Sequence, residues 1–133
     1  MRGASRLIGD QLLCGVLVNF KNNQFRTSEG RLLAVFCEAL KRPLFREFAG
    51  TYVFDPDSPE PWSEKLSHAF GGLIGKGVST GVDFQAYTID STLRDRYNKT
   101  IKPKLGQREE LLRRLAGQIE NSLAKKQPVP ALF

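Results

Sequence analysis

Apolar residues recur at helical spacing over most of this chain, and only two short stretches have the composition or alternation of a strand. The first helical segment runs from Leu7 to Phe20, and the second follows a capping Thr27 or Ser28 and stops at Pro43. Further helices are predicted at residues 44–48, 61–76, 92–101 and 107–125. We therefore expect an α+β fold that is mostly helical.

The two stretches with strand character are residues 51–54 and residues 82–89. Thr51–Phe54 is β-branched or aromatic, and Val82–Ile89 alternates after a turn over residues 78–81. The helix over residues 61–76 with the hairpin over residues 78–89 suggests a winged-helix-like arrangement with a small two- or three-stranded sheet. Pro103 and Gly106 are expected to interrupt the helix that begins after Asp90 or Ser91.

A chain of 133 residues is of the usual size for one domain. We expect a single winged-helix-like domain over residues 1–126 and an extended C-terminal tail over residues 127–133, where two prolines exclude a helix. The apolar end of this tail is similar to short docking peptides, which makes Leu132 and Phe133 candidate contacts with a partner. The alternative is a tail that packs on its own domain or on a dimer mate.

The sequence predicts a cytoplasmic protein without a membrane partner. Its longest apolar stretches, such as Leu32–Cys37, fall far short of the roughly 20 residues of a membrane span. Arg2 and Arg6 precede an apolar run as in a signal peptide, but polar residues at positions 10 and 11 interrupt that run. Two cysteines within apolar stripes indicate buried, reduced thiols.

Charge is unevenly distributed along the chain, whose net charge is +6. Basic and acidic residues number 8 and 4 in residues 1–50, 2 and 6 in residues 51–90, and 10 and 4 in residues 91–133. An acidic middle therefore lies between basic flanks, and such an excess attracts phosphate backbones or an acidic protein face. The candidate nucleic-acid contacts are Arg94, Arg96, Lys99, Lys102, Lys104, Lys65 and Lys76. The alternative for the 94–104 stretch is a solvated helix and loop.

Four short motifs carry a resemblance to a family: Val53-Phe54-Asp55, Pro61 to Leu66, Gly72 to Val78, and Gln85 to Ile89. Over about residues 29–97 the chain resembles the SocA-like and Panacea-type antitoxin-associated domains of bacteria and phages. It departs from them at Glu60-Pro61, where those domains usually have Gly-Pro. The resemblance implies toxin neutralisation, phage defence or transcriptional control, through protein or DNA contacts.

Catalytic residues do not form a recognisable set. The single histidine, His68, lies on the polar side of its predicted helix, and Cys14 and Cys37 belong to apolar stripes. Asp55 and Asp57 are paired carboxylates in a proline-rich loop without a third ligand, so we interpret them as turn residues. No glycine-rich phosphate loop occurs. We expect no enzyme, no cofactor and no metal.

The expected function is that of a non-catalytic regulatory or interaction protein of a prokaryote or phage, such as an antitoxin, an adaptor or a small defence-system subunit. Trp62 is a candidate partner contact beside Leu132 and Phe133, and the alternative, which we favour for Trp62, is a place in the core. The alternative is a winged-helix DNA-binding regulator. Because the helix over residues 61–76 lacks Arg, Asn and Gln, its DNA contacts would be mainly to the backbone. A homodimer is compatible with either function.

Overall fold

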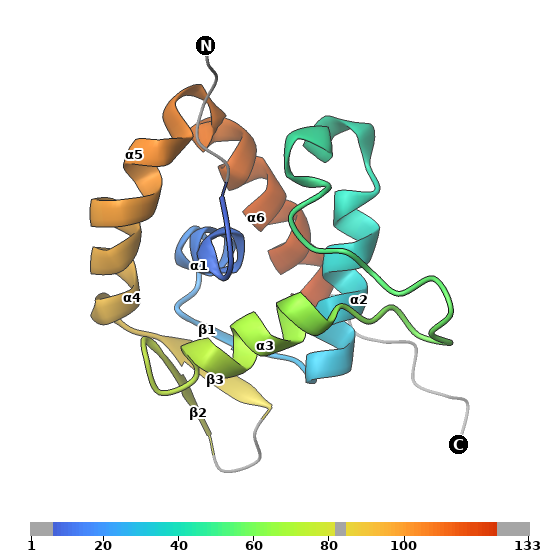
Figure 1. Ribbon diagram of the computed structural model, residues 1–133. Coiled ribbons are helices and arrows are strands. Elements are labelled where there is room, and N and C mark those ends of the chain that lie inside the picture. The colour runs from blue at the N-terminus through green and yellow to red at the C-terminus, as the bar shows by residue number, and fades with distance from the viewer. Residues whose placement is uncertain (1–6, 82–84, 125–133) are drawn as a thin grey trace.

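Helix α1 (Gln11–Val18) is the centre of the fold. Its sequence is apolar on every side after Gln11, and all residues from Leu12 to Val18 are buried. A helix of this kind needs neighbours in every direction. In the computed structural model, which describes residues 7–81 and 85–124, α1 contacts α3, α4, η2 and α6. Figure 1 shows it end-on, with the other helices arranged around it.

The remaining elements follow in a simple order. A short strand and two helical elements come first, namely β1 (Gln24–Arg26), α2 (Glu29–Leu40) and the 3₁₀ helix η1 (Pro43–Phe48). A long loop leads to α3 (Glu64–Leu73) and the hairpin strands β2 (Val78–Thr80) and β3 (Ala86–Ile89). The last part is helical: α4 (Ser91–Arg96), the π-helical turn η2 (Tyr97–Ile101), α5 (Lys102–Leu105), the 3₁₀ turn η3 (Gly106–Arg108) and α6 (Glu109–Ala124).

The three strands form one antiparallel sheet in the order β1-β3-β2. Phe25, Tyr87 and Thr80 lie opposite one another across it. The Phe25 and Tyr87 rings stack at 5.3 Å, and Phe70 of α3 meets Tyr87 edge-on at 5.1 Å. These aromatic contacts join one face of the sheet to the helical core.

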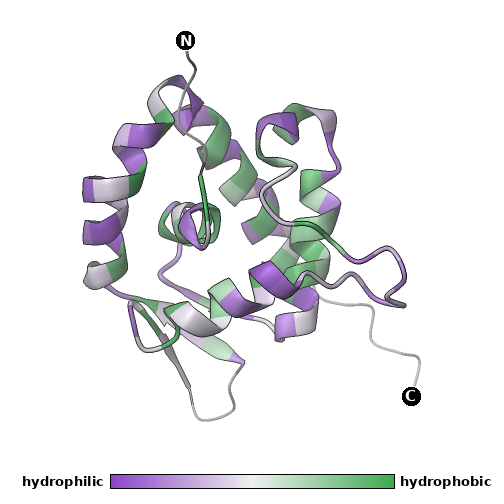
Figure 2. Ribbon diagram, in the orientation of Figure 1, coloured by the Kyte–Doolittle hydropathy of each residue, from purple (hydrophilic) through white to green (hydrophobic). Residues whose placement is uncertain are grey.

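The fold is α+β and mostly helical, as the sequence predicts. Helix α3 is followed directly by the β2–β3 hairpin, which is the arrangement on which the winged-helix-like expectation rests. The buried apolar residues form one continuous core that draws on every part of the described chain. Figure 2 shows α4 and α5 with hydrophobic colours toward α1 and hydrophilic colours outside. No helix within residues 7–81 and 85–124 combines the length and apolar character of a membrane span.

Several element boundaries differ from the predictions. Residues 51–54 are not a strand: no strand among the described residues pairs with them, and the Thr51 N–H instead donates to the Phe48 carbonyl in a turn. Strand β1 was not expected, and residues 78–80 form β2 instead of a turn. Pro103 does not end the helix. It lies in the first turn of α5, where a backbone N–H has no acceptor within α5, so the N–H that proline lacks is not needed there. The tail over residues 127–133 lies outside the described residues.

The turn between α3 and β2 requires a glycine at position 77. Its φ is +123°, and a Cβ built there would lie 2.8 Å from Cβ of Leu93 and 3.1 Å from the Leu93 backbone nitrogen. The Gly77 carbonyl also accepts from the Asp90 N–H at 2.9 Å, which ties the turn to the start of α4.

We expect Gly77→Ala to lower the free energy of unfolding by about 2–4 kcal/mol, because it combines backbone strain with overpacking against Leu93. Urea denaturation measures this change. Gly117→Ala in α6 is the control, since its Cβ would meet no atom within 4 Å among the described residues and should raise stability by up to about 1 kcal/mol. Equal stability of the two variants would contradict the prediction.

Candidate functional site

Helix α3 has one buried and one open side. Ser63 caps it by accepting from the Leu66 N–H at 3.2 Å, and Ser67 donates to Glu29 of α2 at 2.6 Å. The buried side consists of Leu66, Ala69, Phe70 and Leu73. The opposite side is exposed and consists of Glu64, Lys65, His68, Gly71 and Gly72. This open side follows the helix from end to end.

Two adjacent glycines lie on that open side, in the last turn of α3. A Cβ at Gly71 or Gly72 would meet no atom within 4 Å among the described residues, so packing of the chain itself does not require either glycine. Glycine in a helix interior costs about 1 kcal/mol relative to alanine. The open space over Gly71 and Gly72 faces away from the described part of the chain, so another backbone can approach closely there.

A pocket of about 600 Å³ lies beside α3 and is lined by Lys65, His68, Gly72, Lys76, Asp10 and Arg96, among others. We call it the basic pocket. Lys65 and Lys76 have no ion pair within the described part of the chain. Three of the predicted nucleic-acid contacts, Lys65, Lys76 and Arg96, are therefore brought together here, although Arg96 lies 20 residues or more from both in sequence.

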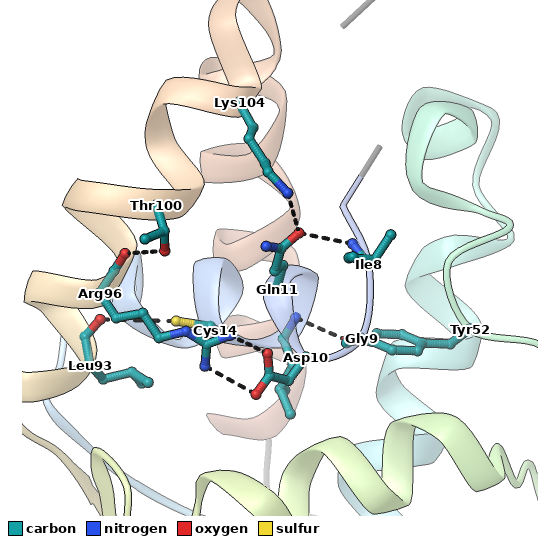
Figure 3. A network of polar contacts seen from close by, with 11 residues as sticks. Ile8, Gly9, Asp10, Gln11, Cys14, Tyr52, Leu93, Arg96, Thr100 and Lys104 are labelled. Carbon is teal, nitrogen blue, oxygen red and sulfur yellow. Dashed lines mark hydrogen bonds and ion pairs between the residues drawn. The ribbon is translucent and has the colours of Figure 1, made fainter. Parts of the chain in front are cut away.

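Arg96 is held at the wall of the basic pocket by a bidentate contact with Asp10. Its two terminal nitrogens donate to the two carboxylate oxygens of Asp10, one at 3.0 Å (Figure 3). This hydrogen-bonded partner raises the pKa of the Arg96 guanidinium, which therefore stays charged. The pair joins α4 to the start of α1, and Asp10 offsets most of the charge of Arg96. Net positive charge in the pocket comes from the two lysines.

The rest of the basic stretch lies elsewhere and is mostly engaged. Arg94 donates to the Val18 carbonyl at 3.1 Å and to Asn23, and Lys104 donates to Gln11 at 3.2 Å. Lys102 lies 3.6 Å from Glu109. Lys99 is exposed and has no hydrogen bond or ion pair among the described residues. Apart from Lys99, these side chains fasten the outer helices to α1 or to each other.

The loop before α3 is ordered and acidic. We define the acidic loop as residues 53–63. Its two arms are joined by a hydrogen bond from the Asp55 N–H to the Trp62 carbonyl at 2.8 Å, and Asp57 N–H donates to the Asp55 carboxylate at 2.9 Å. Prolines at positions 56, 59 and 61 restrict it further. In Figure 1 this loop projects from the body of the molecule beside α2.

Four exposed acids gather at the loop and the first turn of α3: Asp55, Asp57, Glu60 and Glu64. No lysine or arginine occurs from residue 47 to residue 64. Two large apolar residues stand at the arms of the same loop. Val53 is 76 % exposed and Trp62 is 37 % exposed, and the Trp62 indole N–H donates to Glu64 at 3.4 Å. The site therefore combines apolar anchors with negative charge at one end of α3.

Side chains that serve catalysis do not converge in the described residues. No group of three or more His, Cys, Asp and Glu among them is placed to hold a metal ion. His68 is exposed, and the Asp55 carboxylate accepts a backbone hydrogen bond within its own turn. Cys14 is fully buried, and this burial raises the pKa of its thiol to about 12, although the nearby Arg96 lowers it. A thiol in that state is a poor nucleophile at neutral pH.

No family model matches the chain, and no curated protein or solved structure is significantly similar to it. The similarity to SocA-like and Panacea-type domains therefore stays a prediction from its short motifs.

Sequence reasoning found part of this site. It singled out Trp62, Lys65 and Lys76: Lys65 lies in the first turn of α3, Trp62 comes just before the helix and Lys76 just after it. It missed Val53, which the expected strand would have half-buried, and Asp10, which it treated only as an interruption of an apolar run. The sequence contained one signal for this pair: Asp10 is an acidic residue inside an otherwise apolar segment, and such an acid indicates a basic partner from elsewhere in the chain. Leu132 and Phe133 lie outside the described residues.

The buried Cys14 thiol predicts how stability depends on pH. Above pH 9 the unfolded chain loses the Cys14 proton, whereas the native thiol keeps it up to about pH 12. Ionisation then favours the unfolded state, so the free energy of unfolding should fall as the pH rises through 9, with a slope that increases toward about 1.4 kcal/mol per pH unit. Burial also raises the pKa of Tyr52, which steepens the fall above pH 10.

Urea denaturation at pH 8, 9 and 10 measures this slope, with Cys14→Ala as the comparison. The variant should be less stable at pH 8 because of the cavity. Between pH 9 and 10 the free energy of unfolding of the variant should fall by about 1 kcal/mol less than that of the wild type. The same slope in both proteins would contradict the assignment to Cys14.

Proposed function

We propose that this chain is a non-catalytic protein-interaction module that binds through the acidic loop and the open side of α3. The observation that carries the proposal is the gathering of Asp55, Asp57, Glu60 and Glu64 beside the exposed Val53 and Trp62. Exposed apolar residues at the centre of a charged rim are typical of protein–protein interfaces. A stiff loop also loses little conformational entropy when a partner binds it.

The same acids argue against DNA recognition by α3. A recognition helix places its N-terminal residues at the base edges of the major groove, between two phosphate backbones. In this chain that end of the helix carries the four acids, which repel phosphates. Arg94, Arg96 and Lys104, which would have supplied backbone contacts, are already bonded within the fold. A DNA-binding regulator is therefore the weaker of the two functions.

Partner chemistry follows from the charge of the surface. The acidic loop suits a protein surface that presents basic residues around one or two apolar side chains. An antitoxin, an adaptor and a defence-system subunit would each act by binding a surface of another protein. The resemblance to antitoxin-associated domains points in the same direction, toward a partner in a prokaryotic or phage-infected cytoplasm.

Val53→Asp tests the proposed surface. The side chain is 76 % exposed, so we expect the midpoint of thermal unfolding to change by no more than about 2 °C. The tagged full chain and the variant are expressed in the native host, and co-purifying proteins are quantified by mass spectrometry. At least one protein should be recovered with the wild type and reduced tenfold or more with Val53→Asp.

Leu44→Asp is the matched control, because Leu44 is 53 % exposed on η1 outside the acidic loop. Recovery of the same proteins in the same amounts with all three chains would contradict the proposal.

A DNA titration tests the weaker function. We expect no change in the fluorescence anisotropy of a labelled 30-base-pair duplex at about 50 mM salt and protein concentrations up to about 100 µM, which is the weak limit of ordinary non-specific binding. Tighter binding that falls steeply with salt and is lost in Lys65→Gln/Lys76→Gln would favour the DNA-binding regulator instead.

A further inference from the structure

The basic pocket lies where three elements meet. One face of α3 forms one wall, and the start of α1 and the last residue of α4 line the rest. Figure 3 shows Asp10 and Arg96, the paired residues that these two elements contribute. A volume of about 600 Å³ falls within the roughly 300–1,000 Å³ of small-molecule sites. The pocket is therefore large enough for a whole small organic molecule.

Positive charge in the pocket exceeds negative charge. Lys65, Lys76 and Arg96 line it together with a single acid, Asp10, which gives +3 − 1 = +2 before its histidine is counted. Glu64 precedes Lys65 in the chain but does not line the pocket. Because neither lysine has an ion pair within the described residues, this excess is available to an anionic ligand.

Arg96 is fixed at the pocket and still has donors to offer. A guanidinium carries five N–H groups, and the bidentate contact with Asp10 uses two of them. The other three have no acceptor among the described residues, and the Arg96 side chain is 38 % exposed. Because Asp10 holds this side chain in place, little conformational entropy is lost when its free donors bind a ligand.

Lys76 reaches the pocket beside Arg96. A Cβ built at Gly77, the next residue, would lie 2.8 Å from Cβ of Leu93, so the backbone after Lys76 adjoins α4. Arg96 follows Leu93 by three residues and lies on the same side of that helix. One ammonium group and one fixed guanidinium are therefore at the same end of the pocket, where they offer charge-assisted hydrogen bonds to the oxygens of a phosphate group.

The rest of the pocket suits an organic body. Apart from His68, its other lining residues are small or apolar, namely Gly9, Ala69, Gly72 and Leu73. A Cβ at Gly9 or Gly72 would meet no atom within 4 Å among the described residues, so bare backbone faces open space at both positions. Glycine at such positions allows a ligand to approach the backbone closely.

Asp10 adds a preference for hydroxyl groups. An ionised carboxylate has about four positions that accept hydrogen bonds, and Arg96 occupies two of those on Asp10. The Asp10 side chain is 28 % exposed, so its remaining positions are open to a ligand. They repel a phosphate but accept from the hydroxyl groups of a sugar. A nucleotide combines phosphates, sugar hydroxyls and a flat base in one molecule.

We infer that the basic pocket binds a nucleotide, with its phosphate groups at Lys76 and Arg96 and its sugar hydroxyls at Asp10. Its base lies along the apolar part of the pocket formed by Ala69 and Leu73. The inference goes beyond the proposed function, because the ligand is a small molecule and contacts neither the acidic loop nor a protein partner.

Isothermal titration calorimetry of the full chain with ADP, GDP, CDP and UDP gives the first test. At about 50 mM salt we expect at least one of them to bind with a Kd below about 100 µM. The matching nucleoside, which lacks the phosphates, and pyrophosphate, which lacks the sugar and base, should each bind at least about tenfold more weakly. No binding of any of the four up to about 1 mM would overturn the inference, as would pyrophosphate that binds as tightly as the best nucleotide.

Lys76→Gln tests the position of the phosphates. We expect it to bind the nucleotide at least about tenfold more weakly, because a charge-assisted contact is lost. Lys99→Gln is the matched control, since it makes the same change in net charge, +6 − 1 = +5, at an exposed residue outside the pocket. The control should bind like the wild type, and equal affinities of the two variants would overturn the assignment.

Two glycine variants test the pocket without a change of charge. Gly71 and Gly72 both lie in the last turn of α3, and a Cβ at either meets no atom within 4 Å among the described residues. Leucine favours a helix over glycine, so Gly71→Leu and Gly72→Leu should both unfold at or above the wild-type midpoint. Gly72 lines the pocket and Gly71 does not, so only Gly72→Leu should weaken nucleotide binding, by about tenfold or more. Equal binding by both variants would place the ligand elsewhere and overturn the inference.

A single strand of about 20 thymidine nucleotides distinguishes a free nucleotide from nucleic acid as the source of the phosphates. We expect it to displace the bound nucleotide only weakly, because the exposed acids before α3 repel a longer phosphate backbone. Displacement by the strand at a concentration equal to that of the free nucleotide would show a nucleic-acid groove and overturn the inference. Val53→Asp, which lies outside the pocket, should bind the nucleotide like the wild type, so this inference and the proposed function can fail separately.

Discussion

Enclosure of α1 is the constraint on which the rest of the structure depends. In a short apolar helix whose residues from Leu12 to Val18 are all buried, backbone groups near the ends need hydrogen-bond partners from elsewhere in the fold. At the N-terminal end the Tyr52 hydroxyl accepts from the Leu13 N–H at 3.2 Å and donates to the Gly9 carbonyl at 3.0 Å. At the C-terminal end Arg94 donates to the Val18 carbonyl at 3.1 Å. Distant parts of the chain thus complete the hydrogen bonding of one central helix.

Because of these hydrogen bonds, much of the basic stretch over residues 94–104 serves the fold itself. In the sequence, Arg94, Arg96 and Lys104 belong to a run of cations typical of a phosphate-binding surface. In the fold, Arg94 serves the end of α1, Arg96 is paired with Asp10, and Lys104 reaches Gln11. The charges left for partners lie around α3: the exposed acids stand before the helix and in its first turn, Lys65 is next to Glu64, and Lys76 follows the helix.

Features that depend on residues close together in the sequence could be predicted, whereas features that depend on contacts between distant residues could not. Local signals worked: Ser28 accepts from the Arg31 N–H and Asp90 from the Thr92 N–H, as their positions before apolar stripes predict. Thr51–Phe54 has the composition of a strand, but no other strand among the described residues pairs with it, and the Tyr52 hydroxyl bonds to the start of α1. Contacts such as Asp10 with Arg96, which are 86 residues apart, leave no local pattern to read. For the site, the sequence identified charged residues in and beside α3. It did not show which basic side chains would form hydrogen bonds or ion pairs within the fold.

The position of α1 in the chain also bears on how the molecule is made. Its residues leave the ribosome about a hundred positions before those of α6, which covers one side of it. During that interval the apolar residues of α1 are not fully covered, because α4 and η2, which also contact α1, are synthesised late as well. Closure of the core must therefore wait until nearly the whole described chain has been synthesised. Contacts of such long sequence separation slow folding and prolong the exposure of apolar surface. A nascent chain of this design is a natural client for chaperones.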